Sequence, residues 1–204
     1  MDSYEEIIDL INEFYQIHCS FSERYYRNDL GAHPNLWKIY NEDFENNKDN
    51  FSIILNYRNI MIKDKDLKRQ LGTCVFKHKD CERYRYKLDT TIMDKVESYY
   101  KKEDHIGKIC IAKTINDLCG VRIICPNVRG NDKIQKILQS FKDDKIIKRY
   151  YTKDKHRYKA IHCYFQLKNN YFPWELQIWD EKDAQLNHYL HEEHEKRRKE
   201  VLQL

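Results

Sequence analysis

Two acidic residues that lie far apart in the sequence each accompany an apolar, strand-like segment. Asp117 comes shortly before residues 121–125, a β-branched run typical of a buried strand, and Glu175 lies inside the apolar segment 174–179. A buried carboxylate is costly unless a cation pairs with it. If the two strands are neighbours, Asp117 and Glu175 could share one divalent ion. Mg²⁺ suits such a site because it prefers a few carboxylates plus substrate phosphates.

Both segments also have an ordinary structural explanation. Asp117 could mark the start of a strand and form a salt bridge, and residues 174–179 could be an edge strand with Glu175 and Gln177 facing solvent. Gly120 lies between Asp117 and Arg122, where the chain could turn or a ligand could approach the backbone closely. The spacing alone leaves a metal site and a structural role open.

A second group of candidates is cationic and lies within residues 81–101. Arg85 and Lys87 share one face if the chain is extended, and Lys95 lies one helical turn after Thr91. Three cations that converge suit a polyphosphate, because guanidinium and ammonium groups neutralise several oxygens together. The alternative is a charged surface helix.

Residues 152–159 form a basic segment, which we expect to be a loop between two strands, with Tyr158 near its end. A tyrosine beside cations can stack on a nucleobase while the cations face phosphates, although an ordinary basic turn has the same composition. His162 follows in a strand, where a histidine is more often a hydrogen-bonded structural group than a catalyst.

The C-terminal residues 183–204 predict a polar helix. His188, His191 and His194 recur every three residues, but position 195 is Glu and such steps drift around a helix, so we do not predict zinc there. A basic cluster lies near the helix end: Lys196, Arg197, Arg198 and Lys199. This cluster favours the helix dipole and could face phosphates, although a solvated helix end explains it equally.

The composition is that of a globular protein. A chain of 204 residues with 41% hydrophobic and 13% aromatic residues is long and apolar enough for one sizeable domain, which excludes a disordered chain. The net charge of +4 permits a phosphate-rich partner without requiring one. The N-terminus shows no targeting pattern and no run approaches membrane-spanning length, so we expect a cytoplasmic protein. The seven scattered cysteines predict buried free thiols rather than disulfides or a zinc site.

Periodicity predicts an α+β fold with a mixed β-sheet flanked by helices. Residues 3–18 and 131–141 have helical apolar stripes, whereas 145–151 and 160–168 read as strands. Residues 20–50 read as loop and short helix. The first helix either packs on the domain or offers its tyrosines as a docking face for another protein.

Four motifs, in this order, resemble those of the RelA/SpoT synthetase domain, and especially its small single-domain members. Residues 85–95 (Arg-x-Lys-x-x-x-Thr-Ile-x-x-Lys) are similar to the family's ATP-binding segment, with Thr where Ser is usual. Residues 116–125 (Asn-Asp-Leu-Cys-Gly-Val-Arg-Ile-Ile-Cys) and 175–178 (Glu-Leu-Gln-Ile) resemble its two acidic strands. Residues 158–162 (Tyr-Lys-Ala-Ile-His) stand where the family stacks the acceptor base.

The resemblance implies a nucleotidyltransferase-like domain that moves the β,γ-diphosphate of ATP to a ribose 3′-hydroxyl and leaves AMP. Asp117 and Glu175 would hold Mg²⁺, and Glu175 would also position or deprotonate the hydroxyl. ATP would bind to four cations: Arg85, Lys87, Lys95 and Arg122. The acceptor would contact a second set: Tyr158, Lys159, His162 and Gln177. One domain would span residues 1–204, with an N-terminal helical region (1–70), a catalytic core (81–179) and a C-terminal helix (183–204).

Departures from the family pattern surround the acceptor. Trp179 replaces an arginine, His156 and Arg157 replace Asn-Gly, and residues 148–150 read Lys-Arg-Tyr instead of Lys-Asp-Tyr. The chain has no His-Asp dipeptide, so the family's hydrolase domain is not expected. This combination looks more like the toxic small synthetases of toxin–antitoxin pairs.

The resemblance to the toxic branch predicts that the acceptor is the 3′-CCA end of tRNA and that an antitoxin protein neutralises a translation-inhibiting toxin. The alternative is a (p)ppGpp or (p)ppApp synthetase that acts on GDP, GTP or AMP-type nucleotides, and a third possibility is an inactive nucleotide- or RNA-binding module. Bound RNA would face basic residues: Lys153, Lys155, Arg157, Lys196, Arg197, Arg198 and Lys199.

Overall fold

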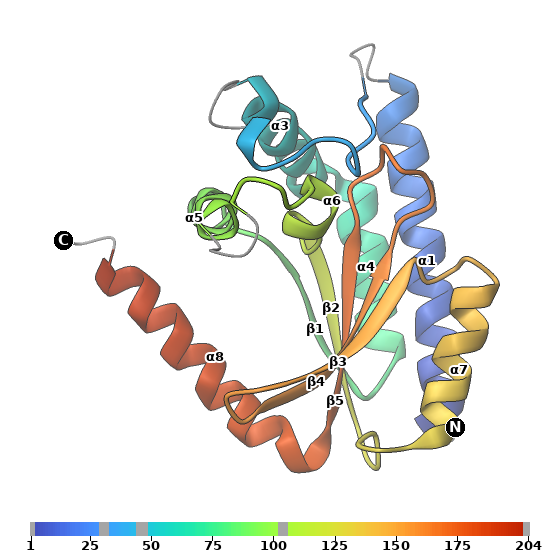
Figure 1. Ribbon diagram of the computed structural model, residues 1–204. Helices are drawn as coiled ribbons and strands as arrows, with labels where there is room; N and C mark the ends of the chain where they lie inside the picture. Colours follow the sequence, from blue (N-terminus) through green and yellow to red (C-terminus); the bar gives the residue numbers. More distant parts are fainter. Residues whose placement is uncertain (1–2, 29–32, 44–48, 102–105, 202–204) are drawn as a thin grey trace.

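A five-stranded sheet forms the centre of the computed structural model (Figure 1). The structure describes residues 3–28, 33–43, 49–101 and 106–201, without the side chains of residues 49–51 and 194–201. The strands are β1 (Cys81–Tyr86), β2 (Cys119–Cys125), β3 (Arg149–Lys155), β4 (Tyr158–Phe165) and β5 (Trp174–Asp180). They follow the order β1-β2-β5-β4-β3, with β2 and β5 parallel and the other neighbours antiparallel.

Helices flank this mixed sheet, which confirms the α+β class predicted from the sequence. They are α1 (Ser3–Asn28), α3 (Asp49–Lys63), α4 (Lys65–Lys77), α5 (Asp89–Tyr100), α6 (Ile111–Thr114), α7 (Asp132–Asp143) and α8 (Glu181–Val201). Figure 1 shows α1, α4 and α7 along one face of the sheet. Helices α5 and α6 lie near one end of the strands toward the other face, and α8 leaves from the opposite end.

The face of the sheet under α1 is apolar. Leu176 and Ile178 of β5 are fully buried there, because alternate residues of a strand point to the same side. Phe14 of α1 packs edge-on against Phe165 of β4, with ring centroids 5.2 Å apart, and also contacts Trp174. This layer of apolar side chains is the core that fixes the sheet in place.

Helix α1 is longer than the sequence predicted. We expected it to end near residue 18, with loop and short helix over residues 20–50, but α1 continues without a break to Asn28. The apolar stripe continues through Phe21 and Tyr25, whose rings pack against Tyr57 of α3. Polar neighbours in the sequence hid this stripe, because the partners that bury it come from a distant segment.

The basic segment 152–159 is not a loop. Strands β3 and β4 extend through it and pair antiparallel up to Lys155 and Tyr158, so only His156 and Arg157 form the turn. Both have positive φ, 51° and 70°. A two-residue turn of this kind matches the twist of a hairpin but favours Asn-Gly, since other side chains are strained at positive φ. The strands expected at 145–151 and 160–168 are therefore displaced toward the turn.

Strand β5 lies in the middle of the sheet, which excludes the edge-strand interpretation of residues 174–179. It pairs with β2 in parallel, with Gly120 opposite Glu175, so the neighbour relation on which the shared metal site depended is confirmed. The chain reaches β5 only after α7 and the β3–β4 hairpin. Helix α7, capped by the Asn131 side chain, is close to the expected range 131–141.

The seven cysteines are all within the described residues and are free, and every one except Cys19 is buried, which confirms the prediction of free thiols. Within the described part of the chain, no helix combines the length and apolarity needed to cross a bilayer.

Candidate active site

Polar side chains form two rows on the face of the sheet opposite α1. In the first row Arg85, Gly120, Glu175 and Tyr164 lie directly opposite one another across β1, β2, β5 and β4. The next row on this face contains three more polar residues: Arg122, Gln177 and His162. Strand pairing therefore brings together residues from four predicted motifs, and we call this surface the polar face.

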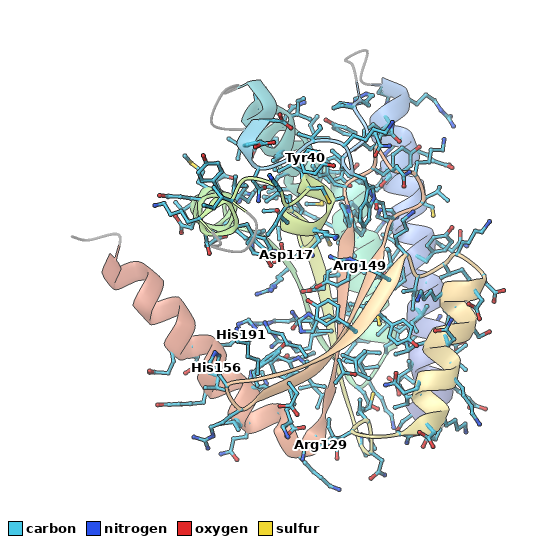
Figure 2. The ribbon with its side chains drawn as sticks, in the orientation of Figure 1. Tyr40, Asp117, Arg129, Arg149, His156 and His191 are labelled. Carbon is cyan, nitrogen blue, oxygen red and sulfur yellow. The ribbon has the colours of Figure 1, made fainter. Side chains whose placement is uncertain are left out.

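Asp117, two residues before β2, is buried between two lysines near one end of the strands (Figure 2). Lys87 Nζ donates to Asp117 Oδ2 at 2.8 Å, and Lys95 Nζ donates to Oδ1 at 2.9 Å. Burial alone would raise the pKa of Asp117, but the two ammonium groups outweigh it and hold that pKa well below its ordinary value. Asp117 is therefore an ionised carboxylate at neutral pH.

Lys87 and Lys95 reach Asp117 from the positions expected from the sequence. Lys87 follows β1, and Lys95 lies one turn after Thr91 in α5. Lys95 also donates to Asn116 Oδ1 at 3.0 Å. Burial lowers the pKa of Lys87, and attraction to Asp117 opposes that effect only in part. The structure thus brings two of the predicted ATP-binding cations together with the first carboxylate.

Glu175, the second carboxylate, is buried on the polar face and accepts hydrogen bonds at both oxygens. Oε1 lies 2.8 Å from His162 Nδ1 and 2.8 Å from the Tyr164 hydroxyl, and Oε2 accepts from Gln177 Nε2 at 2.7 Å. Burial acts to raise its pKa, but His162 outweighs burial and the pKa falls to about 2. The charge of Asp117 acts on Glu175 in the raising direction, which shows that the two carboxylates interact.

The two carboxylates are suited to hold Mg²⁺. Each ionised carboxylate offers about four lone-pair sites. Each Asp117 oxygen accepts one lysine proton, and Glu175 Oε2 accepts only one amide proton, so these three oxygens keep free lone pairs. Lys87 and Lys95 compete for the same oxygens, and a bound ion would therefore be favoured when the lysines have phosphates to pair with.

Arg85 is the cation whose charge is least used by the protein. Within the described residues its guanidinium has no hydrogen bond or ion pair, although it lies on the polar face within electrostatic reach of Glu175. A Cβ added to Gly120 would lie 3.8 Å from Arg85 Nε, so the glycine leaves space for this side chain. Gly120 is a residue of β2 and makes no turn, which corrects that expectation.

Arg122, in contrast, is buried and fully engaged. It donates to Glu82 Oε2 at 3.0 Å and to Gln177 Oε1 at 3.2 and 3.3 Å, and its guanidinium lies 3.6 Å from the Trp179 ring centroid. Burial lowers the pKa of Arg122, and Glu82 opposes that effect. Gln177 connects Arg122 to Glu175, so it is a link within the site rather than an unoccupied contact for a substrate.

Tyr158 and His162 continue the polar face toward the β3–β4 turn. The Tyr158 hydroxyl lies 3.2 Å from His162 Nε2, and the Tyr158 ring lies edge-on to Trp179, with centroids 6.0 Å apart. Because the Glu175 carboxylate can only accept, His162 donates to it from Nδ1. Lys159 points to the other face of β4 by strand alternation and pairs with Asp154, so it does not join the predicted acceptor group.

The candidate RNA-binding residues fall into two groups. The first group is exposed on the β3–β4 hairpin and consists of Lys153, Lys155 and Arg157. Figure 2 labels His156 at the tip of this hairpin. Lys153 Nζ lies 5.1 Å from the Tyr158 ring centroid. The side chains of the second group lie outside the described residues: Lys196, Arg197, Arg198 and Lys199.

Residues 84–200 match the family model of the region found in RelA / SpoT proteins. This match spans more than half of the chain. The chain belongs to the RelA/SpoT family. A RelA/SpoT synthetase domain implies a pyrophosphotransferase, without showing its acceptor.

Solved structures of small RelA/SpoT-type enzymes are similar to this chain at low identity. Small alarmone synthetase 1 from Bacillus subtilis, bound to its product pppGpp, has 19% identity and a TM-score of 0.37, with 73% of this chain and 82% of that chain covered. Small alarmone synthetase 2 from the same organism has 19% identity and a TM-score of 0.36, with 76% and 83% covered. Comparison with curated protein sequences gives no match.

Several residues of the candidate site were not found from the sequence. His188 and His191 of α8 lie against Trp179, with ring centroids 5.2 and 6.0 Å apart, and His191 also contacts Tyr158. Asn187 holds α8 in place, because its side chain bonds both the N–H and the carbonyl of Lys159. Their three-residue spacing was visible, but which side of α8 faces the sheet was not.

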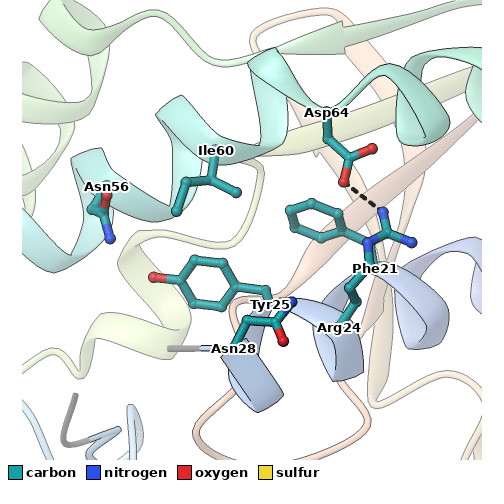
Figure 3. A pocket seen from close by; sticks show the side chains of 7 residues that line it. All are labelled: Phe21, Arg24, Tyr25, Asn28, Asn56, Ile60 and Asp64. Atoms are coloured by element: carbon teal, nitrogen blue, oxygen red, sulfur yellow. Dashed lines mark hydrogen bonds and ion pairs between the residues drawn. The ribbon is translucent and has the colours of Figure 1, made fainter. Parts of the chain in front are cut away.

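One cavity lies away from the candidate site. It has a volume of about 320 Å³ and lies between α1 and α3, where Arg24 and Asp64 form an ion pair at its edge (Figure 3). Phe21 and Tyr25 line the same cavity. None of the site residues predicted from the sequence contributes to its wall.

Proposed function

We propose that this RelA/SpoT protein transfers the β,γ-diphosphate of ATP to a ribose 3′-hydroxyl. The observation that carries the proposal is that Asp117, held by Lys87 and Lys95, lies within electrostatic reach of Glu175. Two ionised carboxylates beside several cations suit a metal–triphosphate substrate. The covalent step needs little from the protein beyond positioning and charge stabilisation.

The cations differ in whether the protein already provides them with a partner. Arg85 has no described partner and is available to a phosphate at once, whereas Lys87 and Lys95 bond Asp117. When ATP binds, its phosphates offer these lysines new partners and free the Asp117 oxygens. Mg²⁺ held by Asp117 and Glu175 would neutralise charge on the phosphate oxygens. Arg122 keeps its bonds to protein groups when ATP binds, and it fixes Gln177 beside Glu175.

Glu175 acts on the acceptor mainly by orientation. A carboxylate whose pKa is about 2 is a weak base at neutral pH, but its free Oε2 lone pair can accept a hydrogen bond from the 3′-hydroxyl. The 3′ oxygen then forms a bond to the β-phosphorus of ATP. The bond from that phosphorus to the α–β bridging oxygen breaks, AMP leaves with the electron pair, and the hydroxyl proton passes by way of Glu175 to solvent.

The acceptor that we propose is the 3′-CCA end of tRNA. The β3–β4 hairpin supports this choice, because its turn uses His156 and Arg157 at positive φ where Asn-Gly would be relaxed. Strain of this kind is retained where function requires the side chain. The exposed cations Lys153, Lys155 and Arg157 suit a long phosphate backbone, with Tyr158 at the base of the hairpin to receive the terminal base.

Modification of the 3′ end would prevent aminoacylation and stop translation. The protein would then act as a toxin, and a neutralising antitoxin protein is part of the proposal. The second candidate is synthesis of (p)ppGpp or (p)ppApp on free purine nucleotides. The observation that supports this second candidate is the compact aromatic group around Tyr158, whose ring contacts Trp179 and His191. Such a group can stack the base of a free nucleotide as well as the terminal base of tRNA.

A transfer assay tests the proposal. The protein is incubated with Mg²⁺ and ATP labelled on the γ-phosphate, in parallel with deacylated tRNA, GDP, GTP or AMP. Label that appears on tRNA, but not on tRNA whose 3′-terminal diol was oxidised with periodate before the reaction, supports the first acceptor. Label on a nucleotide supports the second acceptor, and absence of transfer to every acceptor contradicts the pyrophosphotransferase itself.

A hairpin variant distinguishes the two acceptors more sharply. His156→Asn combined with Arg157→Gly relaxes the turn and removes a cation, so we expect a more stable protein that modifies tRNA less and free nucleotides equally. Lys145→Gly is the matched control. Like Arg157, Lys145 is an exposed cation at positive φ (61°), but it follows α7 on the other side of the sheet. Equal tRNA modification by both variants would remove the hairpin from the RNA contact.

A further inference from the structure

Three potential metal ligands lie together between α1 and α4, away from the polar face. They are the carboxylate of Glu13, the thiol of Cys74 and the imidazole of His78, and their ligand atoms all lie within 4.8 Å of one another. His78 Nε2 is 3.1 Å from Glu13 Oε2. Cys74 and His78 are buried, at 0% and 2% exposed, whereas the Glu13 side chain is 25% exposed and opens the cluster to solvent.

The fold builds this cluster from two helices. Cys74 and His78 are four residues apart at the end of α4, and the His78 N–H bonds the Cys74 carbonyl at 3.2 Å, so both side chains leave the same face of one turn. Glu13 faces them from α1. Neither spacing nor composition predicted the group, because a site with one cysteine has no paired-cysteine pattern.

Contacts within the described part of the protein do not occupy all three ligand side chains. Glu13 Oε2 also accepts from Lys77 Nζ at 2.8 Å, but the Lys77 side chain is 56% exposed and can turn into solvent. The Cys74 thiol has no hydrogen bond or ion pair with any described residue. Burial raises the pKa of this thiol to about 12, so it remains protonated until a cation replaces the proton.

We propose that Glu13, Cys74 and His78 bind one Zn²⁺ ion, with water at the fourth position. A tetrahedral zinc with bonds of about 2.0–2.3 Å separates its ligand atoms by roughly 3.3–3.7 Å. The 3.1 Å between Glu13 Oε2 and His78 Nε2 is close to this range, and the third ligand atom lies within 4.8 Å, so small side-chain rotations close the site. A thiolate and an imidazole select zinc over Mg²⁺, which prefers oxygen ligands.

The ion would tie α1 to the end of α4, directly before β1. That strand carries Arg85 into the active site, so zinc would stabilise the layer that supports the polar face without contacting the substrate. Because the ion binds the folded chain and the unfolded chain does not hold these ligands together, zinc raises the melting temperature.

The test uses the full chain, freed of metal with a chelator and titrated with Co²⁺ in excess Mg²⁺. We expect one equivalent of Co²⁺ to give the visible bands of a tetrahedral ion and a near-ultraviolet thiolate charge-transfer band, both lost when Zn²⁺ is added. Cys74→Ser should abolish the charge-transfer band, and His78→Gln and Glu13→Gln should each weaken binding at least tenfold. Cys19→Ser, a control on α1 outside the cluster, should leave the titration unchanged.

Melting curves of each metal-free variant show whether it folds, and Glu13→Gln is the least disruptive because Glu13 is the most exposed of the three. The proposal is wrong if Co²⁺ binds without a thiolate band, if the band survives in Cys74→Ser, or if folded wild-type protein binds no Co²⁺. In the last case the group is a hydrogen-bonded packing contact only.

Discussion

The two faces of the central sheet use the same strands for opposite purposes. On β5, Leu176 and Ile178 pack into the core under α1, whereas Glu175 and Gln177, one residue away, point to the polar face. Both faces are buried, so the difference is not exposure but partners. The apolar face gains stability from the area it removes from water. The polar face is tolerable because its buried charged and amide groups bond one another, as Glu175 does with His162 and Gln177.

Because neighbouring residues of β5 point to opposite faces, a substitution on the polar face should reduce catalysis, and a substitution at the next residue should reduce stability. Adjacent substitutions can therefore separate the two faces.

Glu175→Gln should reduce pyrophosphate transfer about 10³-fold, equivalent to about 4 kcal/mol of transition-state stabilisation. The amide keeps the size of the side chain but loses the charge that supports the metal and orients the hydroxyl. Transfer rates and thermal melting are measured together, with Glu97→Gln as a control of equal charge change on exposed α5. A loss of less than tenfold would mean that this carboxylate is not part of the catalytic group.

Leu176→Ala should have the opposite profile. Leu176 is 0% exposed, and truncation of such a side chain costs about 2–5 kcal/mol of folding free energy. Urea denaturation measures this loss, while the transfer rate per folded molecule at low temperature should change little. If activity disappears while stability is kept, the two faces are not functionally separate.

The two faces should also respond to different pH ranges. His18 of α1 is buried on the apolar side, donates to the Phe172 carbonyl, and has its pKa lowered by burial from 6.5 to about 4. The unfolded chain therefore binds a proton first, and this group removes up to about 3 kcal/mol of stability as pH falls from 6.5 to 4. His18→Gln should flatten the stability curve in that range.

Glu175 acts in a lower range. Its folded pKa of about 2 lies below the ordinary 4.5, so its contribution is present above pH 4.5 and is lost as pH falls toward 2. Glu175→Gln should therefore leave the slope between pH 6.5 and 4.5 unchanged. Denaturation curves of the wild type and both variants across these ranges measure the difference, and identical slopes for all three would contradict both assignments.

The smallest effect is expected from a matched pair of tryptophans. Trp179 lies on the polar face under the Arg122 guanidinium, and Trp174 lies on the apolar face with its Nε1 donating to the Tyr57 hydroxyl at 3.0 Å. Trp179→Phe should weaken the cation–π contact by about 0.5–1 kcal/mol and slow transfer severalfold. Trp174→Phe should instead lower the unfolding free energy by about 1 kcal/mol. If transfer rate and unfolding free energy both fall in both variants, the two faces do not have separate roles at these positions.

Much of the fold could be predicted from local patterns. The apolar runs at β2 and β5 and the periodicity of α7 are properties of single segments, and such patterns survive without knowledge of their neighbours. The parallel pairing of β2 with β5 was only a condition in the sequence argument. A buried strand needs a partner on both edges, but its own residues do not say which strand that partner is, so the pairing came from the structure.

The parts that failed depend on contacts between segments. The second half of α1 is helical because Tyr57 and other distant side chains bury its aromatic residues. The β3–β4 hairpin extends further than expected because a two-residue turn was not recognised in His156-Arg157, which lacks the usual Asn-Gly.

The candidate site shows the same limit. Asp117 and Glu175 could be predicted because each is a charge beside an apolar run. Glu82 and His191 could not, because a bulge in β1 and the docking angle of α8 decide where these side chains point. Lys159 failed for the simplest reason, since the alternation of an extended chain puts it on the other face from Tyr158.

The parallel pairing of β2 with β5 has a consequence for synthesis of the protein. Asp117 emerges from the ribosome well before Glu175, and the α7 and β3–β4 segments must be made between them. A nascent chain therefore carries only half of its acid pair until β5 has inserted between β2 and β4. We expect a nascent chain to show no transfer activity until β5 has been made and has joined β2 and β4.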